Sequence, residues 1–161
     1  MEIMQFAIAM EKDGEKYYLE QADKNGDNAL SVVFRLLAAD EARHADLLQR
    51  MQEDVAYELE SDNRLTQQMD LFSNAEDFHA AVAAVPDQAE LYQAAQEKER
   101  QSIELYGDLK NKASDDVSRA LFAFLLKEEQ KHFTILEEIF RHVNRPNEWV
   151  ESAEFGIREE Y

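Results

Sequence analysis

The sequence predicts an all-α protein of one domain, built from four long amphipathic helices that pair into two hairpins. Its 161 residues include only four glycines and two prolines, whereas a β-sheet protein needs turn residues about every ten positions. Residues with high helix propensity, such as alanine, leucine, glutamate and glutamine, are abundant. Apolar residues recur at helical spacing in four long segments. A chain of this length favours one domain.

The first predicted hairpin covers residues 2–59. Its first helix runs from residue 2 to about residue 22 and stops near Gly26, because glycine commonly follows the end of a helix. Asp27 or Asn28 can cap the second helix, which we expect to run from about residue 29 to the region of residue 59.

A long crossover, residues 60–86, leads to the second predicted hairpin, residues 87–143. We expect a short helix at 75–85 inside the crossover. The third and fourth helices run from 87 to about 109 and from about 116 to 143. The tail, residues 144–161, begins at Asn144-Arg145-Pro146 and is expected to form a short packed C-terminal helix. Short, long and short connections are typical of four-helix bundles with one crossover.

Composition excludes several classes of function. The chain has no cysteine, so a disulfide framework, an iron–sulfur cluster, a thiolate zinc site and a cysteine nucleophile are excluded. A formal charge of −18 argues against nucleic acid as a partner and favours the attraction of cations. No apolar run approaches the ~20 residues of a membrane helix, and the N-terminus lacks a basic leader. We therefore expect a soluble, cytoplasmic protein that contacts no membrane.

An internal repeat relates the two predicted hairpins. A shift of 88 positions superimposes Glu11 on Glu99, and the same shift aligns four further residues of the first half with identical ones in the second. These four pairs are Tyr18 and Tyr106, Phe34 and Phe122, Glu41 and Glu129, and His44 and His132. A single offset over so many matches indicates two hairpins of the same design.

Polar residues interrupt the apolar stripe of each long helix at its middle. Six of them are expected to face the core: Glu11, Glu41, His44, Glu99, Glu129 and His132. Carboxylates are almost never fully buried unless they are paired or bind a metal. Four converging carboxylates would repel one another in an empty core, and two metal cations would neutralise them. The alternative is that the helices are misphased and these residues lie on the surface.

The spacing of these residues matches a known kind of metal site. Glu41 and His44 form an i, i+3 pair on one helix face, as do Glu129 and His132. Each pair can serve one metal, with Glu11 and Glu99 supplied from the other helices. This pattern is typical of ferritin-like di-iron and di-manganese bundles. Carboxylate-rich sites with one histidine per metal favour iron or manganese over copper or zinc.

On these motifs most of the chain resembles the rubrerythrin branch of the ferritin-like superfamily, as a di-iron domain without the rubredoxin domain. The resemblance implies a ferritin-like four-helix bundle, two iron ions, with manganese as the alternative, and the six residues above as ligands. Tyr18 and Tyr106 match positions where the family often keeps a tyrosine beside the cluster, or they are ordinary core aromatics. The absence of cysteine implies an external electron-transfer protein, and Ser102 stands where the family carries a further carboxylate. The resemblance also implies a homodimer.

Several other polar residues have less specific predictions. Asp40 and Glu128 directly precede the paired motifs, but because position i−1 lies about 100° around the helix, we expect both in solvent. His79 and His142 do not belong to the repeat and are interpreted as structural. Gly14 and Ser102 occupy matching positions and leave room for a small molecule or permit close helix packing.

Three functions are compatible with these features. The first is an oxidoreductase in which a pair of ferrous ions passes two electrons to hydrogen peroxide or dioxygen. The second is non-catalytic iron binding or storage of the ferritin type, and the third is a structural bundle with a vestigial site. The complete ligand set favours the first over the third, because unneeded buried charges are costly. The sequence leaves open whether the hairpins are exchanged between chains.

Overall fold

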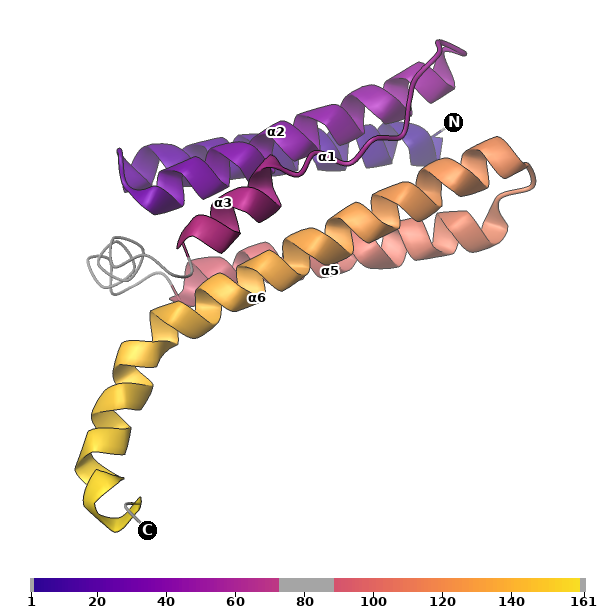
Figure 1. Cartoon of the computed structure of the whole chain (residues 1–161). Coiled ribbons are helices and arrows are strands. Elements are labelled where there is room, and N and C mark those ends of the chain that lie inside the picture. Colours follow the sequence, from indigo (N-terminus) through magenta and orange to yellow (C-terminus); the bar gives the residue numbers. More distant parts are fainter. Residues whose placement is uncertain (1, 73–88, 160–161) are drawn as a thin grey trace.

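The computed structural model describes residues 2–72 and 89–159, with side chains described as far as Arg141. Its helices are α1 (Glu2–Asn25), α2 (Ala29–Gln52), α3 (Arg64–Phe72), α5 (Ala89–Lys112) and α6 (Asp116–Glu159). Helices α1 and α2 pack as one hairpin, α5 and α6 as the other, and α2 contacts α6 between them (Figure 1). The described ranges contain no strand. The prediction of an all-α, ferritin-like four-helix bundle is confirmed.

The turn between α1 and α2 has the geometry that its residues predict. Gly26 adopts a positive φ of 67°, which only glycine reaches without strain, and α1 ends just before it. Asn28 caps α2: its side-chain oxygen accepts a hydrogen bond of 3.0 Å from the backbone N–H of Ser31. The first hairpin is therefore closed by local backbone chemistry.

Helix α2 ends at Gln52, so the prediction that it reaches residue 59 is wrong. The backbone N–H groups of Asp54 and Val55 turn back to the carbonyls of Met51 and Arg50, at 3.3 and 2.8 Å. Asp54 has a φ of 56°. These bonds form the Schellman arrangement that ends a helix, and aspartate is one of the few residues other than glycine that tolerate this conformation.

The crossover contains α3, which the sequence analysis did not predict. Asp62 caps this helix by accepting a 2.9 Å hydrogen bond from the backbone N–H of Arg64. Leu65 and Met69, one helical turn apart, are buried in the core. The predicted helix at 75–85 and His79 lie outside the described residues.

Helix α6 continues past Pro146 to Glu159, so the prediction of a break near residue 143 and of a separate C-terminal helix is wrong for the backbone. Proline removes one helical hydrogen bond and bends the axis, but helical backbone can continue on both sides. Figure 1 shows the C-terminal part of α6, in yellow, turning away from the bundle. The side chain of His142 and the packing of the tail lie outside the described side chains.

The core consists of two apolar clusters separated along the bundle by a polar layer. One cluster includes a stack of Tyr18, Phe34 and Tyr92, with ring centroids 6.2 and 5.9 Å apart. The other includes Leu48 and Leu121. On every long helix the predicted glutamate lies between residues of the two clusters. The apolar clusters therefore shield the polar layer from water at both ends.

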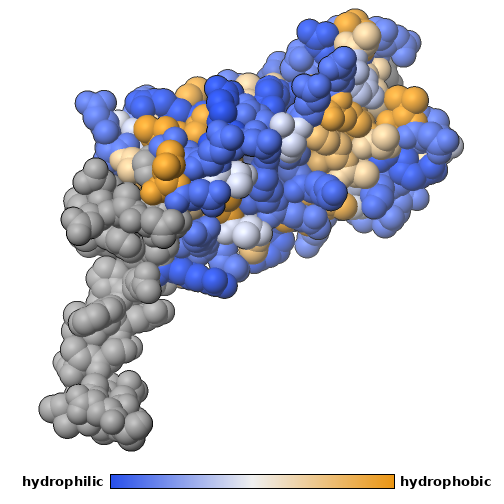
Figure 2. Space-filling model, in the orientation of Figure 1, coloured by the Kyte–Doolittle hydropathy of each residue, from blue (hydrophilic) through white to orange (hydrophobic). Residues whose placement is uncertain are grey.

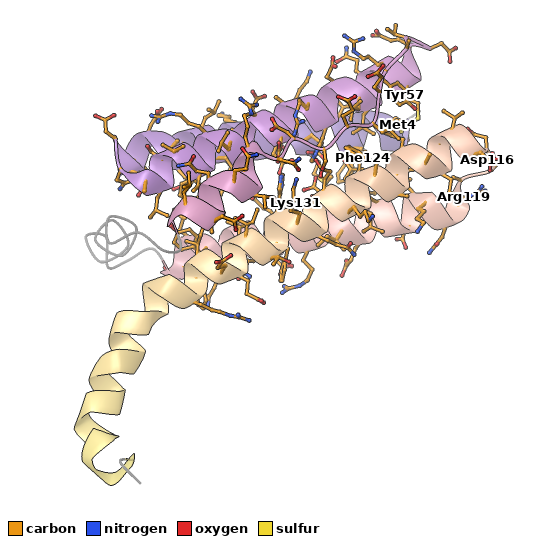
Figure 3. All side chains as sticks on the ribbon, viewed as in Figure 1. Met4, Tyr57, Asp116, Arg119, Phe124 and Lys131 are labelled. Carbon is orange, nitrogen blue, oxygen red and sulfur yellow. The ribbon has the colours of Figure 1, made fainter. Side chains whose placement is uncertain are left out.

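The outer surface is mostly hydrophilic. Figure 2 shows polar side chains over most of one face, with apolar patches toward both ends of the bundle, one of them where Figure 3 labels Met4 and Phe124. Within the described residues, no helix is both long enough and apolar enough to cross a membrane.

Candidate metal centre

The bundle brings together all six side chains that the sequence analysis selected as metal ligands. Each is at most 4% exposed. Their donor atoms form two groups, and within each group all ligand atoms lie within 4.8 Å of one another. One group contains Glu11, Glu41, His44 and Glu129, and the other contains Glu41, Glu99, Glu129 and His132. The repeat in the sequence therefore corresponds to two adjoining half-sites in the core.

Glu41 and Glu129 belong to both groups, whereas each of the other four residues belongs to one. A carboxylate has two oxygens, so Glu41 and Glu129 can each bridge two cations. Glu11 and Glu99 are placed as terminal donors. The sequence analysis assigned one Glu–His pair to each metal and did not distinguish bridging from terminal carboxylates, because that distinction depends on how the hairpins face each other.

The two imidazoles present the same nitrogen to the carboxylates. Nδ1 of His44 lies 3.4 Å from Glu11 Oε2 and 3.3 Å from Glu129 Oε1. Nδ1 of His132 lies 3.4 Å from Glu41 Oε1 and 3.5 Å from Glu99 Oε1. The rings stack with centroids 5.6 Å apart. Nδ1 is thus the candidate donor atom on both histidines, and Nε2 points away from the cluster.

The carboxylates divide into two electrostatic classes. Burial opposes the ionisation of Glu11, but His44 and neighbouring hydrogen bonds hold its pKa far below the usual range. Burial also opposes ionisation of Glu99, yet hydrogen bonds within the cluster lower its pKa to about 2. For the shared Glu41 and Glu129, burial and the charges of the other carboxylates raise the pKa well above normal. Without metal, the surroundings of the shared pair therefore favour the protonated form of both carboxyl groups.

The carboxylates around both histidines favour the charged imidazolium form in the metal-free protein. Burial disfavours the imidazolium, but Glu11 raises the pKa of His44 well above normal, and Glu99 does the same for His132. Protons thus provide the positive charge that would otherwise come from metal.

We expect metal uptake to release protons, because cations replace those held by Glu41, Glu129, His44 and His132. We expect a net release of protons at neutral pH. Since protons are products of binding, apparent metal affinity rises as pH rises. Calorimetric titrations with Mn²⁺ in two buffers of different ionisation enthalpy measure the number of protons released. Identical heats in both buffers would contradict this prediction.

Each of the two tyrosines donates a hydrogen bond to the terminal carboxylate of the other hairpin. Tyr18 Oη lies 2.5 Å from Glu99 Oε1, and Tyr106 Oη lies 2.5 Å from Glu11 Oε1. Burial and the neighbouring carboxylates raise the pKa of both phenols well above normal, so they stay protonated donors. Each tyrosine thereby engages one oxygen of a carboxylate and leaves Oε2 directed elsewhere, which fixes the orientation of the candidate ligand.

Asp40 and Glu128 are buried, so the prediction that they lie in solvent is wrong. They are 2% and 3% exposed. Asp40 Oδ2 lies 2.8 Å from Nε2 of His132, and Glu128 Oε1 lies 3.5 Å from Nε2 of His44. Each carboxylate faces the histidine of the opposite hairpin rather than that of its own helix. Only the Asp40–His132 contact is a hydrogen bond, because Glu128 Oε1 and His44 Nε2 have no hydrogen-bond partner among the described residues. Such contacts orient the imidazole and fix which nitrogen is free to bind metal.

The segment between α2 and α3, residues 55–63, contacts Glu128 directly and contacts the basic residues that pair with Asp40 and Glu128. Ser61 Oγ donates a 2.7 Å hydrogen bond to Glu128 Oε2. Lys131, labelled in Figure 3, pairs with Glu128 at 3.2 Å and reaches the backbone oxygen of Asp62 at 3.5 Å. Arg43 pairs with Asp40 and lies 4.0 Å from Asp62. The crossover therefore braces the supports of both histidines.

Replacing Asp40 with asparagine is expected to weaken metal binding by about ten- to a hundred-fold, because His132 loses a charged acceptor for its Nε2–H. The matched control is Asp46→Asn, on the same helix, where the carboxylate is exposed and pairs with Arg50. Competition with a chelator of known affinity gives the dissociation constant of the metal for each variant. Equal affinities in the two variants would show that Asp40 has no such role.

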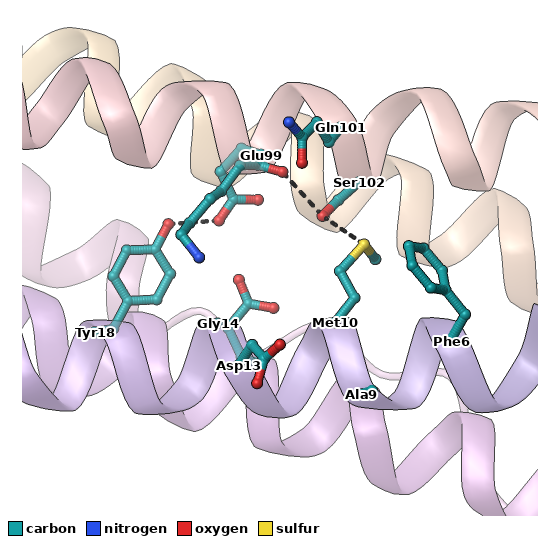
Figure 4. A pocket seen from close by; sticks show the side chains of 11 residues that line it. Phe6, Ala9, Met10, Asp13, Gly14, Tyr18, Glu99, Gln101 and Ser102 are labelled. Carbon is teal, nitrogen blue, oxygen red and sulfur yellow. Dashed lines mark hydrogen bonds between the residues drawn. The ribbon is translucent and has the colours of Figure 1, made fainter.

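A pocket of about 240 Å³ opens between α1 and α5 onto the carboxylates Glu41 and Glu99 (Figure 4). Gly14 lines this pocket beside Glu41: a Cβ at position 14 would lie 3.3 Å from the carboxyl carbon of Glu41, a tight contact that would displace this carboxylate by a few tenths of an ångström. A glycine inside a helix costs roughly 0.5–1 kcal/mol relative to alanine. Ser102, the small residue at the matching position, also lines the pocket. The two small residues thus leave an open approach to the cluster on this side.

The donor set fits a pair of metal cations. Oε2 atoms of Glu11, Glu99 and Glu129 and Nδ1 of His132 are buried without a hydrogen-bond partner among the described residues. Unpartnered buried polar atoms are rare in folded proteins and need a ligand or an ion. Here they converge in one place and have the chemistry of metal ligands. The cluster therefore has the donor set and the convergence that a di-iron type of metal site needs.

Comparison with known proteins agrees with this arrangement. A family model described as rubrerythrin matches residues 2–140, which include all four long helical segments of the bundle and every residue of the cluster. No curated protein and no solved structure matches the chain. Because the family model covers most of the chain, this protein belongs to the rubrerythrin family.

Proposed function

We propose that the protein is a di-iron oxidoreductase that reduces hydrogen peroxide or dioxygen with electrons from an external one-electron carrier protein. The observation that supports this most is the pairing of two half-sites through Glu41 and Glu129, beside a pocket that reaches the same carboxylates. A purely structural bundle needs neither buried donor atoms without partners nor an open approach to them.

The proposed ligands follow from the geometry. Glu41 and Glu129, which belong to both donor groups, would help to hold both irons, while Glu11 and His44 would help to hold one iron and Glu99 and His132 the other. The oxygen-rich donor set suits iron and manganese. When bound, the irons would supply two electrons and open coordination positions to the oxidant.

The side chains around the cluster have three roles in this proposal. Tyr18 and Tyr106 hold the terminal carboxylates in place through their hydroxyl groups. Asp40 and Glu128 orient the two imidazoles. The apolar clusters on either side exclude bulk water, so that small molecules reach the site through the pocket between α1 and α5. Reduction of hydrogen peroxide consumes two electrons and two protons, breaks the O–O bond and yields two molecules of water.

The test is a stopped-flow experiment on protein loaded anaerobically with ferrous iron. Addition of hydrogen peroxide is expected to oxidise the bound iron at least ten-fold faster than it oxidises free ferrous ion in the same buffer, because the site holds both metals next to one pocket. Oxidation no faster than that of the free ion would overturn the proposal. Continued uptake well beyond two irons per chain would instead favour the storage function.

A further inference from the structure

The pocket between α1 and α5 is larger than hydrogen peroxide or dioxygen requires. Its volume is about 240 Å³, whereas one water molecule occupies about 30 Å³ of the liquid and a cavity of about 150 Å³ holds a benzene-sized molecule. A second ligand group of about four to six carbon atoms therefore fits beside a peroxide.

The two ends of the pocket differ in chemistry. Glu41, Glu99 and the hydroxyl of Tyr18 form the end beside the cluster, and the charged Asp13 and Lys98 also line the pocket. At the other end Phe6, Ala9 and Met10 supply an apolar lining, next to the polar Gln101 and Ser102 (Figure 4). Ser102 Oγ lies 3.2 Å from the backbone oxygen of Lys98 and 3.5 Å from Met10 Sδ, and either atom can accept its single O–H. The apolar end thus offers side-chain carbon and sulfur next to a site proposed to reduce O–O bonds.

We propose that this pocket accepts small organic hydroperoxides in addition to hydrogen peroxide. The hydroperoxide group would lie at the carboxylate end and the alkyl group against Phe6, Ala9 and Met10. The inference rests on the proposed function and specifies its substrate class. Two electrons from the external carrier and two protons break the O–O bond: ROOH gives ROH and water.

The kinetic test compares two oxidants on the same ferrous-loaded protein. With tert-butyl hydroperoxide, iron oxidation is expected to be at least ten-fold faster than for free ferrous ion, with tert-butanol formed in equal amount to the hydroperoxide consumed. If hydrogen peroxide reacts and tert-butyl hydroperoxide does not, the substrate class is wrong and the proposed function stands. If neither reacts faster than with free iron, both proposals fail.

A variant separates pocket binding from general reactivity. Ala9 is exposed on α1 and lines the apolar end, so Ala9→Trp is expected to fill that end without disturbing the core. We expect the rate with tert-butyl hydroperoxide to fall at least ten-fold more than the rate with hydrogen peroxide, because the larger oxidant needs the space that the indole fills. The matched control is Ala94→Trp, at an exposed position of α5 that does not line the pocket. Equal loss with both oxidants would overturn the assignment of the alkyl group to this end.

Binding can also be measured without iron. Metal-free protein labelled with ¹³C at its methionine methyl groups is titrated with tert-butanol, and the Met10 signal is assigned with the variant Met10→Leu. The chain has five methionines, so the other four serve as internal controls. A saturable shift of the Met10 methyl that disappears in Ala9→Trp supports the proposal. No shift, or equal shifts at all methionines, would overturn it.

Discussion

Replacing both Glu41 and Glu129 with glutamine is expected to abolish metal binding. These two carboxylates are the only residues common to both donor groups in the described cluster, so each substitution removes a ligand from both half-sites. Glutamine has nearly the same shape but does not ionise, and it is a weak donor for iron. Metal content should fall from about two ions per chain to near zero, measured by elemental analysis after anaerobic loading with ferrous iron and desalting.

The fold of this variant is expected to survive, because the substitution removes two buried ionisable groups whose burial opposes their charge. Circular dichroism would show unchanged helix content. The control is Glu20→Gln/Glu104→Gln, which changes the net charge equally at exposed positions of α1 and α5. Metal retained in the first variant, or lost equally in both, would mean that the cluster is not the metal site.

The hairpins and the convergence of the cluster could be predicted because they depend on local periodicity. Apolar spacing fixes which face of each helix points inward, and the offset of 88 residues places Glu11, Glu41, Glu99 and Glu129 at equivalent depths in the two halves. Once the inward face of each helix and the depth of each glutamate are fixed, the four helices can pack together in few ways. The reciprocal tyrosine contacts follow the same symmetry, since each tyrosine is two turns from the glutamate on its own helix but bonds the glutamate opposite.

The roles of Asp40 and Glu128 could not be obtained by reasoning along one helix. The angle of about 100° between neighbouring positions does turn them away from the glutamates beside them. That turn directs them to the seam between α2 and α6, where the histidine of the other hairpin presents Nε2. Their equivalence under the 88-residue offset was the available signal: an acidic residue at the same place in both halves.

The ends of α2 and α6 and the position of α3 were missed for a different reason. The end of α2 depends on Asp54 adopting a positive φ, and aspartate does so only occasionally. Helix α3 is short, and its burial depends on Leu65 and Met69 docking against an already formed core. Tertiary contacts, rather than helix propensity, therefore decide where these helices form and end.

Metal binding is expected to raise the melting temperature of the wild-type protein by roughly 8–16 °C. A ligand that binds only the folded state, at a free concentration about a thousand times its Kd, adds about 4 kcal/mol to the free energy of unfolding. For a chain of this size each kcal/mol shifts the midpoint by about 2–4 °C. Differential scanning calorimetry of chelator-treated protein with and without Mn²⁺ gives the shift.

The net charge of −18 offers a competing explanation, because any divalent cation reduces repulsion between surface carboxylates. Binding at the buried cluster and screening of surface charge differ in which cation they favour and in whether they need the residues of the cluster. Mg²⁺ prefers octahedral oxygen ligands and retains its waters, so at equal concentration it screens the surface without filling a site that contains histidine. We therefore expect Mn²⁺ to stabilise the wild type far more than Mg²⁺ does, and Glu41→Gln/Glu129→Gln to respond equally weakly to both. An equal response of the wild type to the two cations would attribute the stabilisation to surface charge and remove this support for a buried metal centre.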